Sequence, residues 1–348
     1  MKIKLLTQIL IFLSFNVLAQ QHYFVNVNIG SDNNLGSKEK PLKTITEATK
    51  RVNSDNQNGS AEIIVSAGRY LISETALLKN NRNLSANNRI TIRAEVLPDD
   101  VNWNPQLMPT IVTAVPLHKD DFGETAFGFD IEISHVAIQG LRFLGGLDFE
   151  YMKENQLRRS YPIWRGGKNL DDLVVTQCVF MGDKYVMPLH VGIIANGNGV
   201  VVEHCVFYNC KNPVVFWLAD DGVSKRDAMR NCLVYGASFS GIWTVETSNN
   251  DFDFRNNIIT KSNTAWIRES SLNTKYKIYD SIISDNFAVT GYSSGPAGKS
   301  QNASDFLVFN NIKQNGSIEL EMNPANKDYL HVKRGTFGAE LNAGIFKK

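Results

Sequence analysis

Hydrophobic and polar positions repeat along the middle and C-terminal part of this chain. In each copy, a short apolar strand leads to a small or polar residue and then to more apolar residues. The copies are VAIQGLRFLG (136–145), LVVTQCVFMG (173–182), VVVEHCVFYN (200–209), DAMRNCLVYG (227–236), FDFRNNIITK (252–261), YKIYDSIISD (276–285) and FLVFNNIKQN (306–315). Most of them follow one another at intervals of 24 to 30 residues. A period of this length with short strands is typical of a solenoid, in which successive turns of chain stack to bury a continuous core.

A second series of strands lies between these copies. Five segments align without gaps: PIWRGGKN (162–169), GIIANGNG (192–199), VFWLADDG (215–222), GIWTVETS (241–248) and AWIRESSL (265–272). Turns rich in Gly, Asn, Ser and Asp separate the strands, and no segment with a helical period lies between them. Each turn of the solenoid is therefore predicted to contain at least two short strands, stacked about 4.8 Å from the next turn.

Three cysteines occupy the same position in consecutive copies, 27 residues apart: Cys178, Cys205 and Cys232. The full predicted column of small residues is Gly140, Cys178, Cys205, Cys232, Asn257, Ser281 and Asn311. A metal site is disfavoured, because the chain has no CxxC pair and no His at zinc-finger spacing. A Cys178–Cys205 disulfide is compatible with the distance between turns and stays open as an alternative. Internal packing, with Cys as a small hydrophobe, is the favoured interpretation.

The repeats, together with segments at both ends, resemble the right-handed parallel β-helix proteins of the pectate-lyase-like superfamily. The segment at 23–52 is similar to the start of exported bacterial members, where a loop leads through Pro41 into a helix that caps the solenoid. AEIIVSAGRYLI (61–72) is similar to a first turn, and DYLHVKRGTFGAELNAGIF (328–346) to a closing segment. The resemblance implies an all-β, right-handed parallel β-helix with a short N-terminal capping helix. It implies no single reaction, since the superfamily includes lyases, hydrolases, esterases, epimerases and adhesins.

The first 19 residues have the composition of a secretory signal peptide. Lys2 and Lys4 precede a short apolar run, and Val17-Leu18-Ala19 is a small-residue cleavage site. We therefore expect residues 20–348 to form one β-helix domain, with its N-terminal cap at about 20–60, in a secreted or periplasmic protein. No later apolar segment is long enough to cross a membrane. Removing both lysines changes the net charge from +1 to −1, which gives no sign of nucleic-acid binding, and we expect a monomer.

The gapless alignment separates the two faces of the second series of strands, because side chains alternate along a strand. One column is uniformly large and apolar and is predicted to face inward: Trp164, Ile194, Trp217, Trp243 and Ile267. Its neighbours are then predicted to face outward in three columns: Ile163, Ile193, Phe216, Ile242 and Trp266; Arg165, Ala195, Leu218, Thr244 and Arg268; Gly167, Gly197, Asp220, Glu246 and Ser270. An outward apolar face usually marks a binding site or is covered by a loop.

Three insertions are predicted to wall a groove over these strands: about 145–162, about 290–305, and the turn at 220–228. Long insertions on a rigid scaffold tend to be functional, although they can also simply cover exposed edges. The predicted substrate-binding residues are Arg165, Trp266, Phe216, Arg158, Arg159 and Tyr161.

A lyase acting on an acidic polysaccharide by β-elimination is the first functional hypothesis. A base removes the proton next to a carboxylate, and cations or Ca²⁺ stabilise the resulting charge. The base of β-helix lyases is Arg or Lys, so the resemblance implies Arg268 or Lys225 as the base, with Arg165 holding a carboxylate. Asp220, Asp221 and Glu246 would hold Ca²⁺. The acidic cluster and Arg-containing motif of pectate lyases are absent, as is the paired Glu and Lys motif of the chondroitinase and alginate-lyase type.

A glycoside hydrolase is the second hypothesis, with Asp220 and Glu246 as a carboxylate pair on adjacent turns. LADDG (218–222) is similar to the paired aspartates of polygalacturonase-type β-helices. The companion Gly-His-Gly phrase is absent; LHVG, around His190, comes nearest to it, and a structural role is favoured for this histidine. A non-catalytic carbohydrate-binding or adhesive solenoid is the third hypothesis.

Overall fold

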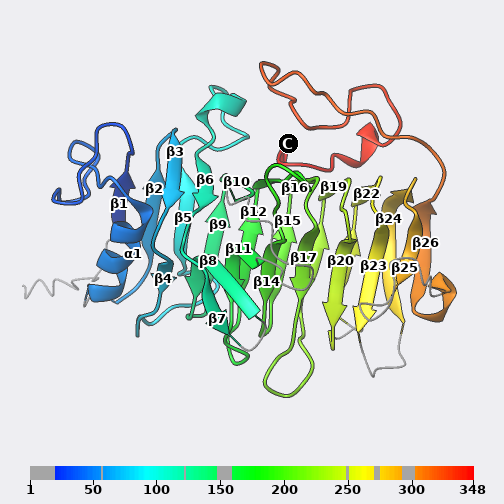
Figure 1. Cartoon of the computed structure of the whole chain (residues 1–348), viewed down its shortest axis with the longest axis horizontal. Coiled ribbons are helices and arrows are strands. Elements are labelled where there is room, and N and C mark those ends of the chain that lie inside the picture. Colours follow the sequence, from blue (N-terminus) through cyan, green and yellow to red (C-terminus); the bar gives the residue numbers. More distant parts are fainter. Residues whose placement is uncertain are drawn as a thin grey trace, which may run out of the picture.

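Three rows of parallel strands wind into one elongated coil (Figure 1). The computed structural model describes residues 20–55, 58–120, 123–146, 159–247, 251–269, 275–291 and 302–348. In each row every strand pairs in parallel with the corresponding strand of the next turn, and only the short strand β7 pairs antiparallel, to β8, in this part of the chain. The chain is therefore a parallel β-helix with three strands in a typical turn, which confirms the solenoid that the repeats predict and the fold that the resemblance implies.

The first two rows hold the two halves of the repeated phrase. The first row is β1 (Gln21–Val25), β2 (Ala61–Val65), β5 (Ile90–Ala94), β9 (Val136–Gln139), β12 (Leu173–Thr176), β15 (Val200–Glu203), β18 (Ala228–Arg230), β21 (Asp253–Arg255), β24 (Tyr276–Ser284) and β26 (Leu307–Lys313). The second row is β3 (Arg69–Ile72), β6 (Thr110–Thr113), β10 (Arg142–Leu144), β13 (Val179–Met181), β16 (Val206–Tyr208), β19 (Leu233–Tyr235), β22 (Ile258–Thr260) and the end of β24.

The third row holds the five aligned segments. It is β4 (Ala76–Leu78), β8 (Gly123–Ile131), β11 (Arg159–Arg165), β14 (Val191–Ala195), β17 (Asn212–Phe216), β20 (Ser240–Val245), β23 (Thr264–Glu269) and β25 (Ala288–Gly291). Strand β7 (His118–Asp120) flanks β8, and within the described ranges 3-10 turns lie at Pro105–Leu107, Ala303–Asp305 and Ala339–Leu341. The predicted insertions at 145–162 and 290–305 lie largely outside the described residues.

From β9 onward, one bend residue with left-handed backbone angles follows each first-row strand, or lies within β24 and β26, where the chain passes from the first row to the second. These residues have left-handed backbone angles, for example φ of 55° at Gln177, 49° at His204 and 52° at Asn231. The predicted small-residue column is one position out at its ends, because Gly140 and Asn311 are themselves bend residues, with φ of 73° and 56°. The residues that stack with the cysteines' column there are Leu141 and Ile312.

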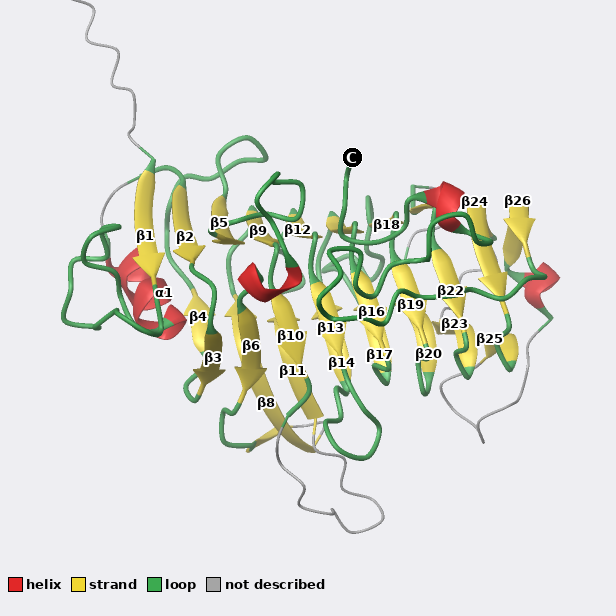
Figure 2. Cartoon of the chain, turned by 90° about the horizontal axis from the view of Figure 1, so that it is seen from above, coloured by secondary structure: helices red, strands yellow, loops and turns green. Residues whose placement is uncertain are grey.

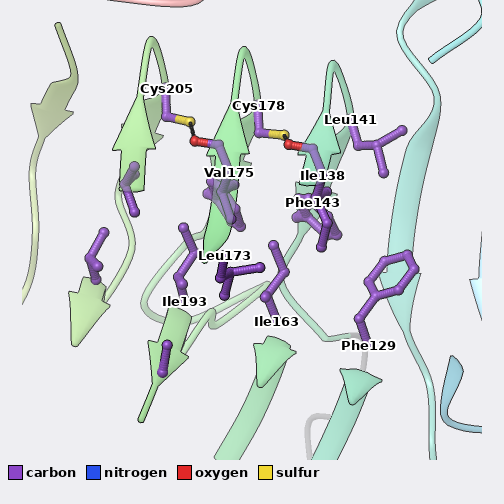
Figure 3. Packing of buried hydrophobic residues seen from close by; sticks show 14 of the residues in the cluster. Phe129, Ile138, Leu141, Phe143, Ile163, Leu173, Val175, Cys178, Ile193 and Cys205 are labelled. Atoms are coloured by element: carbon purple, nitrogen blue, oxygen red, sulfur yellow. Dashed lines mark hydrogen bonds between the residues drawn. The ribbon is translucent and has the colours of Figure 1, made fainter. Parts of the chain in front are cut away.

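The cysteine column lies directly after these bends and points into the core (Figure 3). All four cysteines are free and buried, so the disulfide alternative is wrong. The thiol of Cys178 donates to the carbonyl oxygen of Ile138 at 3.8 Å, and that of Cys205 to Val175 at 3.6 Å. Burial raises the pKa of the Cys205 thiol well above its ordinary value. The column is therefore a packing ladder that also satisfies carbonyl groups of the preceding turn.

The predicted N-terminal helix is α1 (Ile45–Ser54), which lies at the blue end of the coil (Figure 1). The hydroxyl of Thr44 accepts a hydrogen bond from the backbone N–H of Glu47 at 3.1 Å, which caps the first turn. Ala48 and Val52 are fully buried against the core. None of the helices in the described ranges has the length and apolar character needed to cross a membrane.

The C-terminal residues 314–348, here called the C-terminal strap, run back over the second row (Figure 2). They cover an apolar column on the outside of that row, formed by Val179, Val206, Leu233, Ile258 and Ile282. The covering side chains are Ile318, Leu320, Leu330, Ala343 and Ile345. The carbonyl oxygen of Ile345 accepts from Gln177 Nε2 at 3.0 Å, and the Gly344 N–H donates to the Asn231 carbonyl at 2.9 Å.

Candidate functional site

The tryptophan column of the third row faces outward, so the predicted orientation of this sheet is wrong. The column predicted to face outward is fully buried: Ile163, Ile193, Phe216, Ile242 and Trp266 have exposed fractions of 0%. Trp164, Trp217 and Trp243 lie instead in a separate outer cluster. Both columns are large and apolar, so the strands carry no polar alternation that would tell the inner face from the outer one.

A break in strand alternation places further apolar side chains on this outer face. Val191 and Ile194 are three residues apart, yet both line the outer groove. Ile193 is in the core, and a Cβ on Gly192 would lie 3.1 Å from the ring of Phe180, so Gly192 also faces inward. Two successive inward residues therefore leave outward residues on both sides of them, which widens the apolar floor of the groove.

The groove on this face has a volume of about 670 Å³. Its floor is Val191, Ile194 and Val215, on β14 and β17. Two aromatic groups line it on either side: Phe127, Tyr161 and Trp164, and then Trp217, Phe239 and Trp243. The rings of Phe127 and Trp164 stack at 4.9 Å with an interplanar angle of 10°, and those of Trp217 and Trp243 are 6.4 Å apart. An apolar, aromatic cavity with a few polar groups is typical of a small-ligand site.

Three basic side chains lie where the third-row strands begin, and Arg159, His190 and Lys211 are here called the basic edge. Burial, followed by the charges of Lys211 and Arg159, lowers the pKa of His190 to about 3, so its imidazole is neutral at neutral pH. Burial, followed by the charge of Arg159, also lowers the pKa of Lys211. The same positive surroundings that disfavour these cations would stabilise an anion bound in the groove.

Aromatic rings and backbone groups hold the basic edge in place. The ring of His190 meets that of Tyr161 edge-on at 5.8 Å, and its carbonyl oxygen accepts from the Asn212 N–H at 3.1 Å. The Lys211 ammonium lies 5.8 Å from the ring centre of Phe239. These contacts place His190 and Lys211 against the aromatic walls.

The opposite edge of the groove lies where the strands end, and it is formed by Gly166, Lys168, Asn196, Trp217 and Leu218. We call these five residues the far edge. Six residues of extended chain separate His190 from Asn196, which corresponds to about 20 Å at 3.3 Å per residue. The groove is therefore long enough to contact several units of a polymer, with different chemistry at its two edges.

Arg165, predicted to bind a substrate carboxylate, is instead fully buried. It shares the inward parity of Ile163, and its guanidinium donates to the carbonyl oxygens of Asn196 at 2.7 Å and Asn198 at 3.0 Å. Burial lowers its pKa to about 10, against the opposing charge of Asp227, so it remains a cation at neutral pH. Burial likewise raises the pKa of Asp227 to about 7. Arg165 therefore supports the turn beneath the far edge and does not reach the groove.

The predicted carboxylate pair is not assembled as the alignment implied. Val215, rather than Trp217, pairs with Trp243, so one aligned segment is two residues out of register and Asp220 is not next to Glu246 in a column. The run from Val214 to Leu218 is continuously apolar and therefore fits either register. Asp220 lies in an exposed turn, where its N–H donates to the Lys168 carbonyl at 3.2 Å.

The other predicted site residues are dispersed. Lys225 forms an ion pair with Asp221 in the exposed turn after β17. Glu246 follows β20 with φ of 46°, and its N–H donates to the Glu269 carbonyl at 2.9 Å. The Arg268 guanidinium lies 5.6 Å from the ring centre of Phe306. Arg158 and Ser270 lie outside the described residues.

Two predicted substrate-binding residues, Arg159 and Tyr161, line the groove. Among the described residues, no group of three or more His, Cys, Asp or Glu side chains is arranged to hold a metal ion. Sequence reasoning missed Lys211, which lies one residue before β17 and outside the aligned segments, and Asn196, which it treated only as part of a turn.

No protein-family model and no curated protein matches this chain. Among solved structures, the chain is similar to a rhamnogalacturonan lyase, with 12% identity, 77% of this chain and 70% of that chain covered, and a TM-score of 0.44. It is also similar to the GH136 lacto-N-biosidase from Eubacterium ramulus (10% identity, 84% and 68% covered, TM-score 0.47). It is similar as well to the pectin methylesterase from Aspergillus niger, with 12% identity, 87% of this chain and 92% of that chain covered, and a TM-score of 0.36. At these identities and TM-scores the alignments assign no residue role, and the parallel β-helix is established by this chain's own strand pairing.

Proposed function

We propose that this protein is a lyase that binds an acidic polysaccharide in the aromatic groove and cleaves it by β-elimination. The observation that carries the proposal is the basic edge, where Arg159, His190 and Lys211 lie beside stacked aromatic rings. Aromatic walls offer flat apolar surfaces to sugar rings, and the basic edge offers charge to a carboxylate.

Each group of the basic edge has a proposed role. Arg159 holds the uronate carboxylate, because a guanidinium is always charged and can donate two parallel hydrogen bonds. Lys211 is the base, since its lowered pKa leaves more free amine at neutral pH than an exposed lysine has. His190, with a pKa of about 3, is a poor proton acceptor and serves as a neutral hydrogen-bond donor.

The elimination breaks the glycosidic bond without consuming a water molecule. The Lys211 amine takes the proton from the carbon next to the carboxylate, and the released electron pair forms a carbon–carbon double bond. The bond from the next carbon to the glycosidic oxygen breaks, and this oxygen leaves with the bonding pair and takes a proton. Tyr161, which lines the groove beside His190, is the proposed proton donor, and it is recharged from the Lys211 ammonium through solvent.

The test is an assay of the mature protein against a panel of acidic and neutral polysaccharides, with Ca²⁺ and with a chelator. Ultraviolet absorbance of the unsaturated product and new reducing ends are recorded together. Lys211→Met is expected to lower the rate at least about 100-fold. Lys261→Met is the matched control, because Lys261 forms an exposed ion pair with Asp285 on another row. Equal rates for the two variants would contradict the proposal; loss of activity in the chelator would support the Ca²⁺ prediction.

Glycoside hydrolysis is a second candidate, favoured by a neighbouring cleft of about 620 Å³ that shares Phe127 with the groove. Asp130, on β8, and Glu132, directly after it, line this cleft. Burial, followed by the charge of Glu132, raises the pKa of Asp130 to about 6, as a general acid requires. Reducing ends without ultraviolet absorbance, abolished by Asp130→Asn but not by Lys211→Met, would establish this candidate.

A further inference from the structure

The last residues of the C-terminal strap, 343–348, are here called the latch, and they contact the ring of His331. This histidine belongs to the strap and is 8% exposed. Its Nε2 accepts a hydrogen bond from the backbone N–H of Ile345 at 3.1 Å, and its Nδ1 lies 3.1 Å from the carbonyl oxygen of Tyr329. A backbone N–H can only donate, so Nε2 carries no proton and Nδ1 donates to Tyr329. These two bonds therefore assign the ring to one neutral tautomer.

The ring of His331 also packs closely against the latch. It stacks on Phe346, with ring centres 4.5 Å apart and an interplanar angle of 26°. A Cβ atom on Gly344 would lie 2.5 Å from the imidazole Cδ2, so the contact leaves no room for a side chain there. Phe346 in turn meets the buried ring of Trp103 edge-on at 5.4 Å. The imidazole is thus one of the surfaces that hold the latch in place.

The latch is joined to the coil by further backbone hydrogen bonds. The N–H of Gly344 donates to the carbonyl oxygen of Asn231 at 2.9 Å, and the N–H of Lys347 donates to the carboxylate of Asp99 at 3.0 Å. Together with the Ile345 N–H, these groups keep their bonds only while the latch is docked. Their hydrogen exchange with solvent therefore reports on docking.

Several charged or titratable groups surround His331 on the strap side. Burial lowers the pKa of His331 below its ordinary value, and the backbone of Tyr329 and the charge of Asp328 oppose this effect. Asp328 itself forms an ion pair with Arg334 at 2.9 Å. Glu321 pairs with the backbone of His331 through its own N–H, at 2.8 Å. Desolvation therefore outweighs the nearby carboxylate and keeps the ring neutral.

On the coil side, His204, Glu203 and Asp99 face the latch. Burial lowers the pKa of His204, whereas the charge of Glu203 and backbone groups of the latch raise it. The ammonium of Lys347 lies 3.5 Å from the carboxylate of Glu203. The latch backbone thus favours the cationic form of His204, whereas the N–H that it offers to His331 excludes the cation there. His331 is therefore the group whose protonation opposes docking.

We propose that the latch is an acid-operated switch: when His331 takes up a proton, its Nε2 becomes a donor, the bond from Ile345 is lost and the latch leaves the coil. Protonation would otherwise place two donors against each other in a buried contact. Release also uncovers the side of Trp103 against which Phe346 packs. The inference is independent of the proposed function, because no residue of the groove takes part in it.

The direction of the pH dependence follows from proton binding. In the released form the ring is hydrated and has the ordinary histidine pKa of about 6.5. The docked form binds a proton less readily, so the released form carries more protons below this pH. Docking is therefore at full strength above about pH 6.5 and weakens as the pH falls below it, by at most tenfold for each pH unit.

The experiment measures amide hydrogen exchange of the purified protein at pH 7.5 and 5.5, by mass spectrometry with fragmentation that resolves single amides. Exchange is expressed as a protection factor, which removes the intrinsic effect of pH on the exchange rate. The protection factors of Gly344, Ile345 and Lys347 are expected to fall together at pH 5.5, by about 3- to 10-fold. Those of the coil strand β15 are expected to stay unchanged, which shows that the coil itself remains folded.

Three variants separate titration from packing. His331→Gln keeps an acceptor but cannot be protonated, so the latch is expected to lose its pH dependence. Gly344→Ala places a methyl group against the ring and is expected to leave the latch unprotected at both pH values. His22→Gln is the matched control, because His22 is a half-exposed histidine that contacts Glu62 on the first row, and it is expected to behave like the wild type.

The remaining outcomes would overturn the proposal. One is a wild-type latch whose protection changes by less than about 2-fold between the two pH values, a change too small for one coupled proton. Another is a fall that is unchanged in His331→Gln, or that disappears in His204→Gln instead, which would place the sensor on the coil side. Loss of protection at Ile345 alone would show that a single bond breaks while the latch stays docked.

Discussion

His190 gives a quantitative test of whether the basic edge is desolvated as the structure indicates. Its pKa falls from 6.5 in the unfolded chain to about 3 in the folded protein. Between these values the unfolded chain binds a proton that the folded protein does not, so stability falls as the pH is lowered through this window. At pH 5 the loss relative to pH 7 is about 2 kcal/mol, which is 1.36 kcal/mol for each of the 1.5 pH units below 6.5.

The perturbation is His190→Gln, which keeps a donor and an acceptor but cannot be protonated. Asp227 complicates a scan of the wild-type protein alone, because burial raises its pKa to about 7 and its contribution has the opposite pH dependence. The contribution of Asp227 is the same in both proteins, so it cancels in the difference between their free energies of unfolding. The free energy of unfolding of both proteins is measured in urea at pH 7, 6 and 5. We expect the value for the variant, relative to that for the wild type, to rise by about 2 kcal/mol between pH 7 and pH 5. A constant difference would show that His190 is protonated in the folded protein and would refute the desolvated basic edge.

Three further predictions follow from the placement of other side chains. Trp266→Ala should lower the free energy of unfolding, measured in urea, by about 3–5 kcal/mol. Trp243→Ala should lower it less, and should weaken the binding of oligouronates at least about 10-fold. The reverse pattern would show that Trp243 faces the core and Trp266 faces outward. Thiol reagents should leave the native protein unmodified and titrate four thiols after denaturation, and rapid labelling of native Cys205 would contradict the buried ladder. Arg165→Met should lower the free energy of unfolding, measured in urea, by about 3–5 kcal/mol, because it leaves two carbonyl groups and Asp227 without the nearby cation. An unchanged midpoint of unfolding would refute this role of Arg165.

The repeat period predicts the fold well because every turn of a β-helix must satisfy the same stacking constraints. Cys178, Cys205 and Cys232 occupy one environment three times, so they recur at one interval. The capping helix is equally local, since Thr44 at its start is an ordinary cap. These features follow from neighbouring residues and from the turn directly below.

The orientation of the groove sheet does not follow from such local rules. Ile163 and Trp164 are both apolar, and which one is outside depends on the break in alternation next to Gly192 and its counterparts. A recurring Gly or Pro is the signal that was available: Pro162, Gly192, Pro213 and Gly241 stand in the same place on successive third-row strands. The Arg159–Lys211 proximity depends on register between turns, which a continuously apolar segment such as 214–218 leaves undetermined.

The C-terminal strap makes folding of this solenoid dependent on the order in which its parts become available. As turns stack from the N-terminus, the outer side of the second row, including Val206, Leu233 and Ile258, is complete before its cover exists. Until residues 318–345 are in place, the growing coil presents an apolar stripe that lengthens with each added turn. Such exposed stripes invite association between incomplete chains.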